Sequence, residues 1–218
     1  MQIIIMADGV DAAAGDEVTA LEPVALLEVG GRPVIDYALS FASAVGAEHR
    51  IVVSGFLYRE VARHIAAVDV DAVVVENSDF RKGNLLSLLA GRARLEPGGF
   101  LLMSASPIYQ PAMASEVVTV ASRAREVTAF RDGERTLMTW VPSGRVAAHA
   151  DAAHHLLETA GEGCHVEQVL VELTRRGEPP AVADISGHGW LEIDEPDQRA
   201  KADEVLRRER WWLLENPQ

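Results

Sequence analysis

The sequence has few cysteines, few lysines and little positive charge. Its single cysteine, Cys164, excludes an intramolecular disulfide and a zinc or redox site built on a Cys-x-x-Cys pair. Only 2 of its 20 basic residues are lysines, and 33 acidic residues bring the formal net charge to −13. A chain with this charge is not expected to bind nucleic acid or an anionic membrane surface.

Long apolar runs are absent as well. The N-terminal run in MQIIIMADG covers about five residues without a preceding basic segment, which is too short for a signal sequence or a membrane span. We therefore expect a cytoplasmic protein without membrane contact. With 218 residues and 48% hydrophobic content, the chain fits one domain over residues 1–218, because cores grow to roughly 250 residues before they divide.

The first half of the chain alternates between apolar runs and segments of helical spacing. An apolar run without alternation predicts a strand that is covered on both faces. Strands separated by helices imply right-handed βαβ units, so the expected fold class is α/β with a doubly wound, mostly parallel, Rossmann-like sheet. Ligands of such sheets bind beyond the carboxyl ends of the strands. The expected strands are residues 2–7, 49–54, 72–76 and 99–104, and the expected helices are residues 32–45, 57–67 and 84–94.

The second half follows a different pattern. Asp132-Gly133 lies between alternating runs within residues 126–140, which predicts a small β-hairpin. Before it, residues 113–123 give a mixed signal. After it, we expect helices at residues 150–160, 165–176 and 196–214, and a short strand at residues 181–185.

Five blocks of sequence together resemble a known family. They read IIIMADG, LLEVGGRPVIDYAL, VENSDFRKGNLLSLL, FLLMSAS and GWLEIDEPDQRAKADEVL. In this order and spacing, the chain resembles the nucleotidyltransferases that make sugar nucleotides and CDP-alcohols. The third block is similar to that of phosphocholine and inositol-phosphate cytidylyltransferases. The resemblance implies a single nucleotidyltransferase-like domain, with a nucleotide-binding half in residues 1–120. Residues 121–218 would form the acceptor and metal half with its C-terminal helix.

The resemblance also implies a reaction. A phosphomonoester oxygen would attack the α-phosphorus of a nucleoside triphosphate, by preference CTP, and pyrophosphate would leave. Because negative charge accumulates on phosphoryl oxygens, this chemistry depends on cations and backbone amides. By resemblance, Mg²⁺ and the catalytic role fall to Glu192 and Asp194, and the nucleotide site is formed by Ala7, Asp8, Gly9, Asn84 and Ser87.

Three features depart from the family pattern. The loop after Gly9 continues as Val10-Asp11-Ala12-Ala13-Ala14-Gly15, where the family has a glycine followed by Arg-Leu. Val24 stands where the family has a lysine in a Pro-Lys-Pro turn, and Ala105 stands where it has a metal-binding aspartate. Removing one such electrostatic contact typically costs about 10² to 10³ in rate. The alternative function is therefore a catalytically inactive homologue that serves as a ligand-binding, regulatory or structural subunit. Whether residues 11–22 close the cleft is left open by the sequence.

Some candidate residues also have purely structural interpretations. Asp194 precedes Glu-Pro and suits a helix N-cap, while Asn84 and Ser87 suit the start of a helix. Trp211 and Trp212 predict a homodimer or partner contact, because adjacent helical side chains point about 100° apart and one face would not bury both. The competing interpretation is a terminal helix that docks back onto the sheet.

Overall fold

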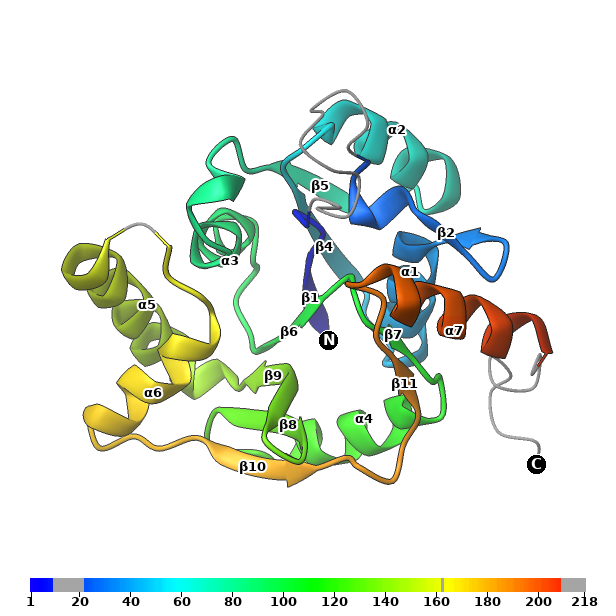
Figure 1. The fold of residues 1–218 in the computed structure, drawn as a ribbon. Helices are drawn as coiled ribbons and strands as arrows, with labels where there is room; N and C mark the ends of the chain where they lie inside the picture. The colour runs from blue at the N-terminus through cyan, green and yellow to red at the C-terminus, as the bar shows by residue number, and fades with distance from the viewer. Residues whose placement is uncertain (10–21, 162, 209–218) are drawn as a thin grey trace.

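A seven-stranded sheet forms the centre of the molecule (Figure 1). The computed structural model describes residues 1–9, 22–161 and 163–208, and the strands counted here lie within them. Their order across the sheet is β10-β8-β9-β6-β1-β4-β5. The bounds are β1 (Gln2–Met6), β4 (His49–Ser54), β5 (Val73–Glu76), β6 (Phe100–Ser104), β8 (Thr128–Asp132), β9 (Arg135–Val141) and β10 (Ala181–Asp184).

Strand direction separates the two halves of the sheet. β1 pairs in parallel with both β4 and β6, and β4 pairs in parallel with β5. β9 runs antiparallel to β6 and β8, which confirms the hairpin predicted around Asp132-Gly133. The doubly wound, mostly parallel α/β fold is therefore confirmed.

Helices pack on both faces of the sheet. Ile3 and Ile5 of β1 belong to one buried cluster, whereas Ile4 and Met6 belong to another, because successive strand residues point to opposite faces. Residues of α1, α2 and α4 contribute to the first cluster, and residues of α3, α5 and α6 to the second. The helices are α1 (Val34–Ala44), α2 (Tyr58–Val68), α3 (Leu85–Arg92), α4 (Met113–Arg123), α5 (Val146–Ala160) and α6 (Glu167–Arg175).

Helix α7 (Pro196–Arg208) lies beside two short strand pairs (Figure 1). β2 (Glu28–Val29) pairs with β3 (Arg32–Pro33), and β7 (Ile108–Tyr109) pairs with β11 (Trp190–Leu191), both antiparallel. The backbone N–H of Gly30 donates to the Asp203 carboxylate of α7 at 2.8 Å. A Cβ at Gly30 would lie 2.7 Å from Leu206 Cβ, so glycine here permits the close approach of α7.

Several predictions fall on segments that the structure does not describe. Residues 10–21, Trp211 and Trp212 lie outside the described residues, as does the predicted helix beyond Arg208. Residues 113–123, whose signal was mixed, form the regular helix α4. Across residues 1–9, 22–161 and 163–208, no helix combines the length and the apolar character needed to traverse a membrane.

Candidate active site

A cleft of about 960 Å³ opens beyond the carboxyl ends of β1 and β6, where the fold predicts a ligand. Its floor is formed by the residues that end these strands and follow them. Its walls come from the start of α3, from α6 and from the β8–β9 hairpin. Polar and charged side chains that line it include Asp8, Arg81, Asn84, Arg131, Glu134, Arg135, His165, Glu167 and Asp194.

Ala7, Asp8 and Gly9 lie in this cleft directly after β1, as predicted. The Asp8 carboxylate accepts a hydrogen bond from the Ser87 hydroxyl. Ser87 is fully buried, and its oxygen accepts a hydrogen bond from the Asn77 amide at 2.7 Å. Burial raises the pKa of Asp8, and the hydrogen bond from Ser87 partly offsets that increase. Ser87, which is itself buried in the core, therefore fixes the position of the Asp8 carboxylate.

Asn84 lines the cleft at the start of α3. Its side-chain oxygen accepts a hydrogen bond from the backbone N–H of Val166 at 2.8 Å. Close by, the N–H of Gly163 donates to the Lys82 carbonyl at 2.7 Å. These bonds join the segment that begins α3 to the connection between α5 and α6, so Asn84 also has a structural role.

Val24 and Ala105, two of the departures from the family pattern, both line the cleft. Val24 begins a short 3₁₀ helix, η3 (Val24–Leu26), and its N–H donates to the Gly9 carbonyl at 3.1 Å. Ala105 is 3% exposed, and its N–H donates to the Met6 carbonyl at 2.8 Å. Neither side chain can contact a phosphate through charge or supply an oxygen to a metal ion.

Glu192 and Asp194 come together around an arginine. Arg135 forms an ion pair with Glu192, and its Nη2 lies 3.7 Å from Oδ2 of Asp194. The other carboxylate oxygen of Asp194 accepts a hydrogen bond from the Ser106 hydroxyl at 2.5 Å. The predicted pair is thus brought to one place, with a guanidinium between its members.

An aromatic ring completes the surroundings of Arg135. The guanidinium carbon lies 4.9 Å from the centroid of the Trp190 ring, a cation–π distance. The indole N–H of Trp190 donates to the Asp132 carboxylate at 2.8 Å. Asp132 and Arg135 lie opposite each other in the β8–β9 ladder. The hairpin therefore carries the Arg135 guanidinium and, through Asp132, also fixes the Trp190 ring on which it stacks.

The described residues do not fit a pre-formed Mg²⁺ site. Within that part of the chain, no group of three or more His, Cys, Asp and Glu residues is placed to hold a metal ion. Glu192 and Asp194 already face the Arg135 guanidinium, and Ala105 offers no ligand oxygen. The assignment of Mg²⁺ to this pair stays a prediction.

Sequence reasoning missed Arg131, Arg135 and His165, all of which line the cleft. The sequence held a weak signal for Arg135. This residue follows the hairpin turn at Asp132-Gly133, so it can be placed at the end of a strand, although nothing local indicates that it lines a cleft. Its partner Glu192 is 57 positions further along the chain, and this contact becomes visible only in the folded structure.

Comparison with known proteins identifies the family. The model of the MobA-like NTP transferase domain matches residues 22–182, which is most of the chain. The chain therefore belongs to the MobA-like NTP transferase family, and this confirms the predicted nucleotidyltransferase relationship.

Individual relatives agree with this family. The chain is 26% identical over 244 residues to CMP-5'-(3-aminopropyl)phosphonate synthase of Streptomyces rubellomurinus (strain ATCC 31215), covering 93% of this chain and 38% of that protein. It thus spans well under half the length of that relative. The fold is similar to the inositol-1-phosphate CTP transferase from T. maritima, with a TM-score of 0.73, 16% identity and 94% of each chain covered. It is also similar to CTP:phosphocholine cytidylyltransferase from Streptococcus pneumoniae, with a TM-score of 0.72, 18% identity, and 94% of this chain and 98% of that one covered.

Proposed function

We propose that this chain transfers a CMP group from CTP to a phosphoryl oxygen of a small phosphomonoester or phosphonate, with release of pyrophosphate. The observation that carries the proposal is the cleft beyond the ends of β1 and β6, which Asp8, Gly9 and Asn84 line together with Arg135 and Asp194. The relatives named as CTP transferases support CTP as the donor. The aminopropylphosphonate synthase supports a phosphonate acceptor.

The reaction forms one bond and breaks one. An acceptor oxygen attacks the α-phosphorus, and the bond from that phosphorus to the bridging oxygen breaks, so pyrophosphate leaves with the electron pair. We assign the triphosphate to the loop that begins with Asp8 and Gly9, in residues 1–120. We assign the acceptor to the cleft wall from residues 121–218, where Arg131 and Arg135 can stabilise phosphoryl charge. Mg²⁺ at Glu192 and Asp194 would require Arg135 to move away, so no step here passes through a metal.

A catalytically inactive homologue is the second candidate. The observation in its favour is that Val24 and Ala105, two replacements of expected charged groups, both line the cleft. On this proposal the cleft binds a nucleotide or phosphorylated ligand without turnover, and the chain serves as a regulatory or structural subunit.

Two measurements on the full chain separate these candidates. The first is thermal unfolding with each of four nucleoside triphosphates, with and without Mg²⁺, since a bound ligand raises the melting temperature. The second is pyrophosphate release with phosphocholine, inositol 1-phosphate and 3-aminopropylphosphonate as acceptors. Release that requires both CTP and an acceptor supports the transferase, whereas a thermal shift without release supports the inactive homologue. The absence of any shift and any release would overturn both.

A matched pair of variants tests the site assignment. Asp194→Asn should lower the rate of pyrophosphate release, because Asp194 lines the cleft and its carboxylate helps to hold the Arg135 guanidinium in place. Asp197→Asn changes a carboxylate in the first turn of α7 and should leave the rate unchanged. Equal rates in the two variants would show that Asp194 takes no part in the reaction.

A further inference from the structure

We propose that the Arg135 guanidinium is the resident cation of this cleft and occupies the place between Glu192 and Asp194 that the family resemblance gives to Mg²⁺. Arg135 thereby keeps the carboxylate pair from taking up a divalent ion. It also presents N–H donors to a phosphoryl oxygen of the acceptor. The contact with the acceptor rests on the proposed function, whereas the exclusion of a divalent ion does not.

The backbone holds Arg135 in a fixed position. It is the first residue of β9 and lies opposite Asp132 in the β8–β9 ladder. The Trp190 ring lies under its guanidinium at 4.9 Å, and the indole N–H is fixed by Asp132 at 2.8 Å. A guanidinium is weakly hydrated and stacks well on aromatic rings, so this arrangement favours arginine over a hydrated ion.

Three of the four carboxylate oxygens of the pair are already engaged. Asp194 uses Oδ2 toward Arg135 and Oδ1 toward Ser106, and Glu192 uses Oε1 toward Arg135. Mg²⁺ requires near-octahedral oxygen ligands at close range and gives up its water reluctantly. To bind here it would have to displace a cation tethered to the same cleft wall. Ala105 adds no oxygen that could compensate.

Arg135 still has donors for an anion. A guanidinium carries five N–H groups, and its contacts with Glu192 and Asp194 involve its two terminal nitrogens. The side chain is 43% exposed and lines the cleft, so part of it faces the space where the acceptor is placed. Arginine binds phosphoryl oxygens through such paired N–H groups. The same side chain can therefore neutralise the pair and contact the acceptor.

The first test measures binding of Mn²⁺, which is detected by its paramagnetic resonance signal. It compares the full wild-type chain with Arg135→Gln, with Arg135→Gln/Glu192→Gln/Asp194→Asn, and with Arg145→Gln. The last is a matched control, because Arg145 bridges Glu126 and Glu178 as Arg135 bridges its pair. We expect no Mn²⁺ at the pair in wild type or in Arg145→Gln, one site gained in Arg135→Gln, and its loss in the triple variant.

Two results would overturn the proposal. One is a Mn²⁺ site in the wild-type chain that Glu192→Gln/Asp194→Asn removes. The other is a folded Arg135→Gln chain, verified by circular dichroism, that gains no site. If the glutamine variant does not fold, Arg135→Lys replaces it, because it keeps the charge without the planar fork. A Mn²⁺ site at the pair in the wild-type chain would overturn the proposal in either case.

The second test uses inorganic phosphate in the presence of EDTA, followed by calorimetry. Wild type and Arg145→Gln should bind it equally, and Arg135→Gln should bind about tenfold more weakly or worse, because a charge-assisted hydrogen bond is lost. Phosphate binding that requires added Mg²⁺ would contradict the proposal. Pyrophosphate release is not used in either test, so failure of the proposed function leaves these results interpretable, and failure here leaves the proposed function standing.

Discussion

Ser87 donates a hydrogen bond to the Asp8 carboxylate, although the two residues are 79 positions apart in the chain. Asn77 in turn donates to the Ser87 oxygen at 2.7 Å. The loop after β1 is therefore attached to α3 through a buried polar chain. Since a buried carboxylate is costly when charged, this hydrogen bond makes its burial tolerable.

Replacing Asp8 with asparagine should stabilise the chain at neutral pH. Burial raises the pKa of Asp8 above its ordinary 3.8, so the folded chain holds this proton more tightly than the unfolded chain. The contribution of Asp8 to stability is therefore greatest below about pH 4 and is lost as the pH rises through the raised pKa. Asp8→Asn should raise the urea midpoint at pH 7 and give little gain at pH 3.5. A lower midpoint at pH 7 would contradict the burial argument, and Asp197→Asn is the control.

Replacing Gly83 with alanine should destabilise the wall of the cleft. Gly83 has φ +106°, and a Cβ there would lie 2.4 Å from the Cys164 carbonyl oxygen. A positive φ at a residue other than glycine costs on the order of 1–3 kcal/mol. The close contact of the Cβ with the Cys164 carbonyl would add to this cost. Urea unfolding should show this loss for Gly83→Ala. Gly144→Ala should show almost none, because a Cβ at Gly144 meets no atom within 4 Å. Similar midpoints for the two variants would refute the prediction.

Acid should destabilise the chain through His149. This residue of α5 is 1% exposed and packs edge-on against Phe100 at 5.8 Å, and burial lowers its pKa to about 3. Its contribution to stability is complete above pH 6.5 and is lost as the pH falls toward 3, because the unfolded chain takes up the proton first. Between pH 7.5 and 5 the loss is about 2 kcal/mol.

A pair of histidine variants measures this loss. Free energies of unfolding in urea should fall less with acid in His149→Gln than in wild type. His154→Gln, on the exposed face of α5, should retain the wild-type pH dependence. If both variants follow wild type, His149 does not titrate as its burial implies.

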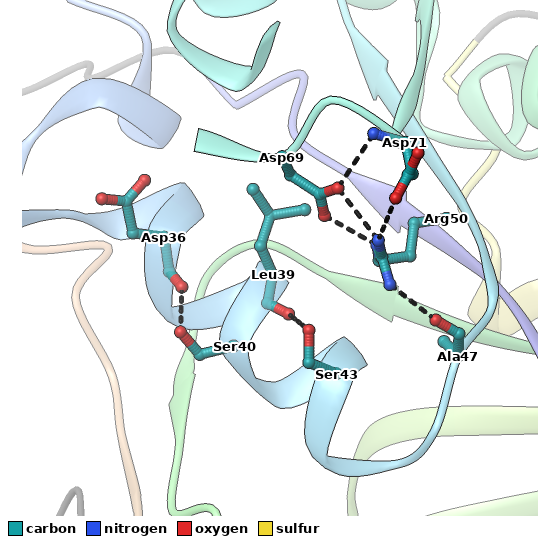
Figure 2. A network of polar contacts seen from close by, with 8 residues as sticks. All are labelled: Asp36, Leu39, Ser40, Ser43, Ala47, Arg50, Asp69 and Asp71. Atoms are coloured by element: carbon teal, nitrogen blue, oxygen red, sulfur yellow. Dashed lines mark hydrogen bonds and ion pairs between the residues drawn. The ribbon is translucent and has the colours of Figure 1, made fainter. Parts of the chain in front are cut away.

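A partly buried ion pair links the start of β4 to the turn after α2. Arg50 contacts Asp69 through two nitrogens, at 2.6 and 2.9 Å, and both side chains are mostly buried (Figure 2). Asp69→Asn leaves the guanidinium without its countercharge and should lower the free energy of unfolding by about 3 kcal/mol. Asp71 is 78% exposed and 4.0 Å from Arg50, so Asp71→Asn should cost less than about 0.5 kcal/mol. Thermal or urea unfolding that ranks them in the opposite order would refute this account.

The parallel half of the sheet could be predicted because its buried strands appear in the sequence as continuous apolar runs. β4 was expected at residues 49–54 and is observed at His49–Ser54, since the centre of a strand that is covered on both faces is apolar without alternation, as Ile51, Val52 and Val53 are here. Helix α4 was not predicted as regular. Its valines and threonine disfavour a helix locally. The burial of Met113, Ala114 and Val117 against the core outweighs that preference.

Position in the fold alone predicted only the site residues that follow a strand, whereas Asn84 and Asp194 were placed by the family resemblance. Asp8 and Gly9 could be placed because they end β1, where such sheets bind ligands. The position of the Arg135 guanidinium between Glu192 and Asp194 could not be predicted in this way. It depends on the β8–β9 hairpin and β11 reaching the same edge of the cleft. Pairing over such separations is decided by the whole fold rather than by local sequence.

The hydrogen bonds that join residues 82–84 to residues 163–166 have an evolutionary consequence. Lys82 and Asn84 accept from the backbone of Gly163 and Val166, so each segment fixes the shape of the other. A change that is neutral in one segment alters the background in which the other is selected. Among related sequences, substitutions in these two stretches are expected to be epistatic and to be accepted in matched combinations.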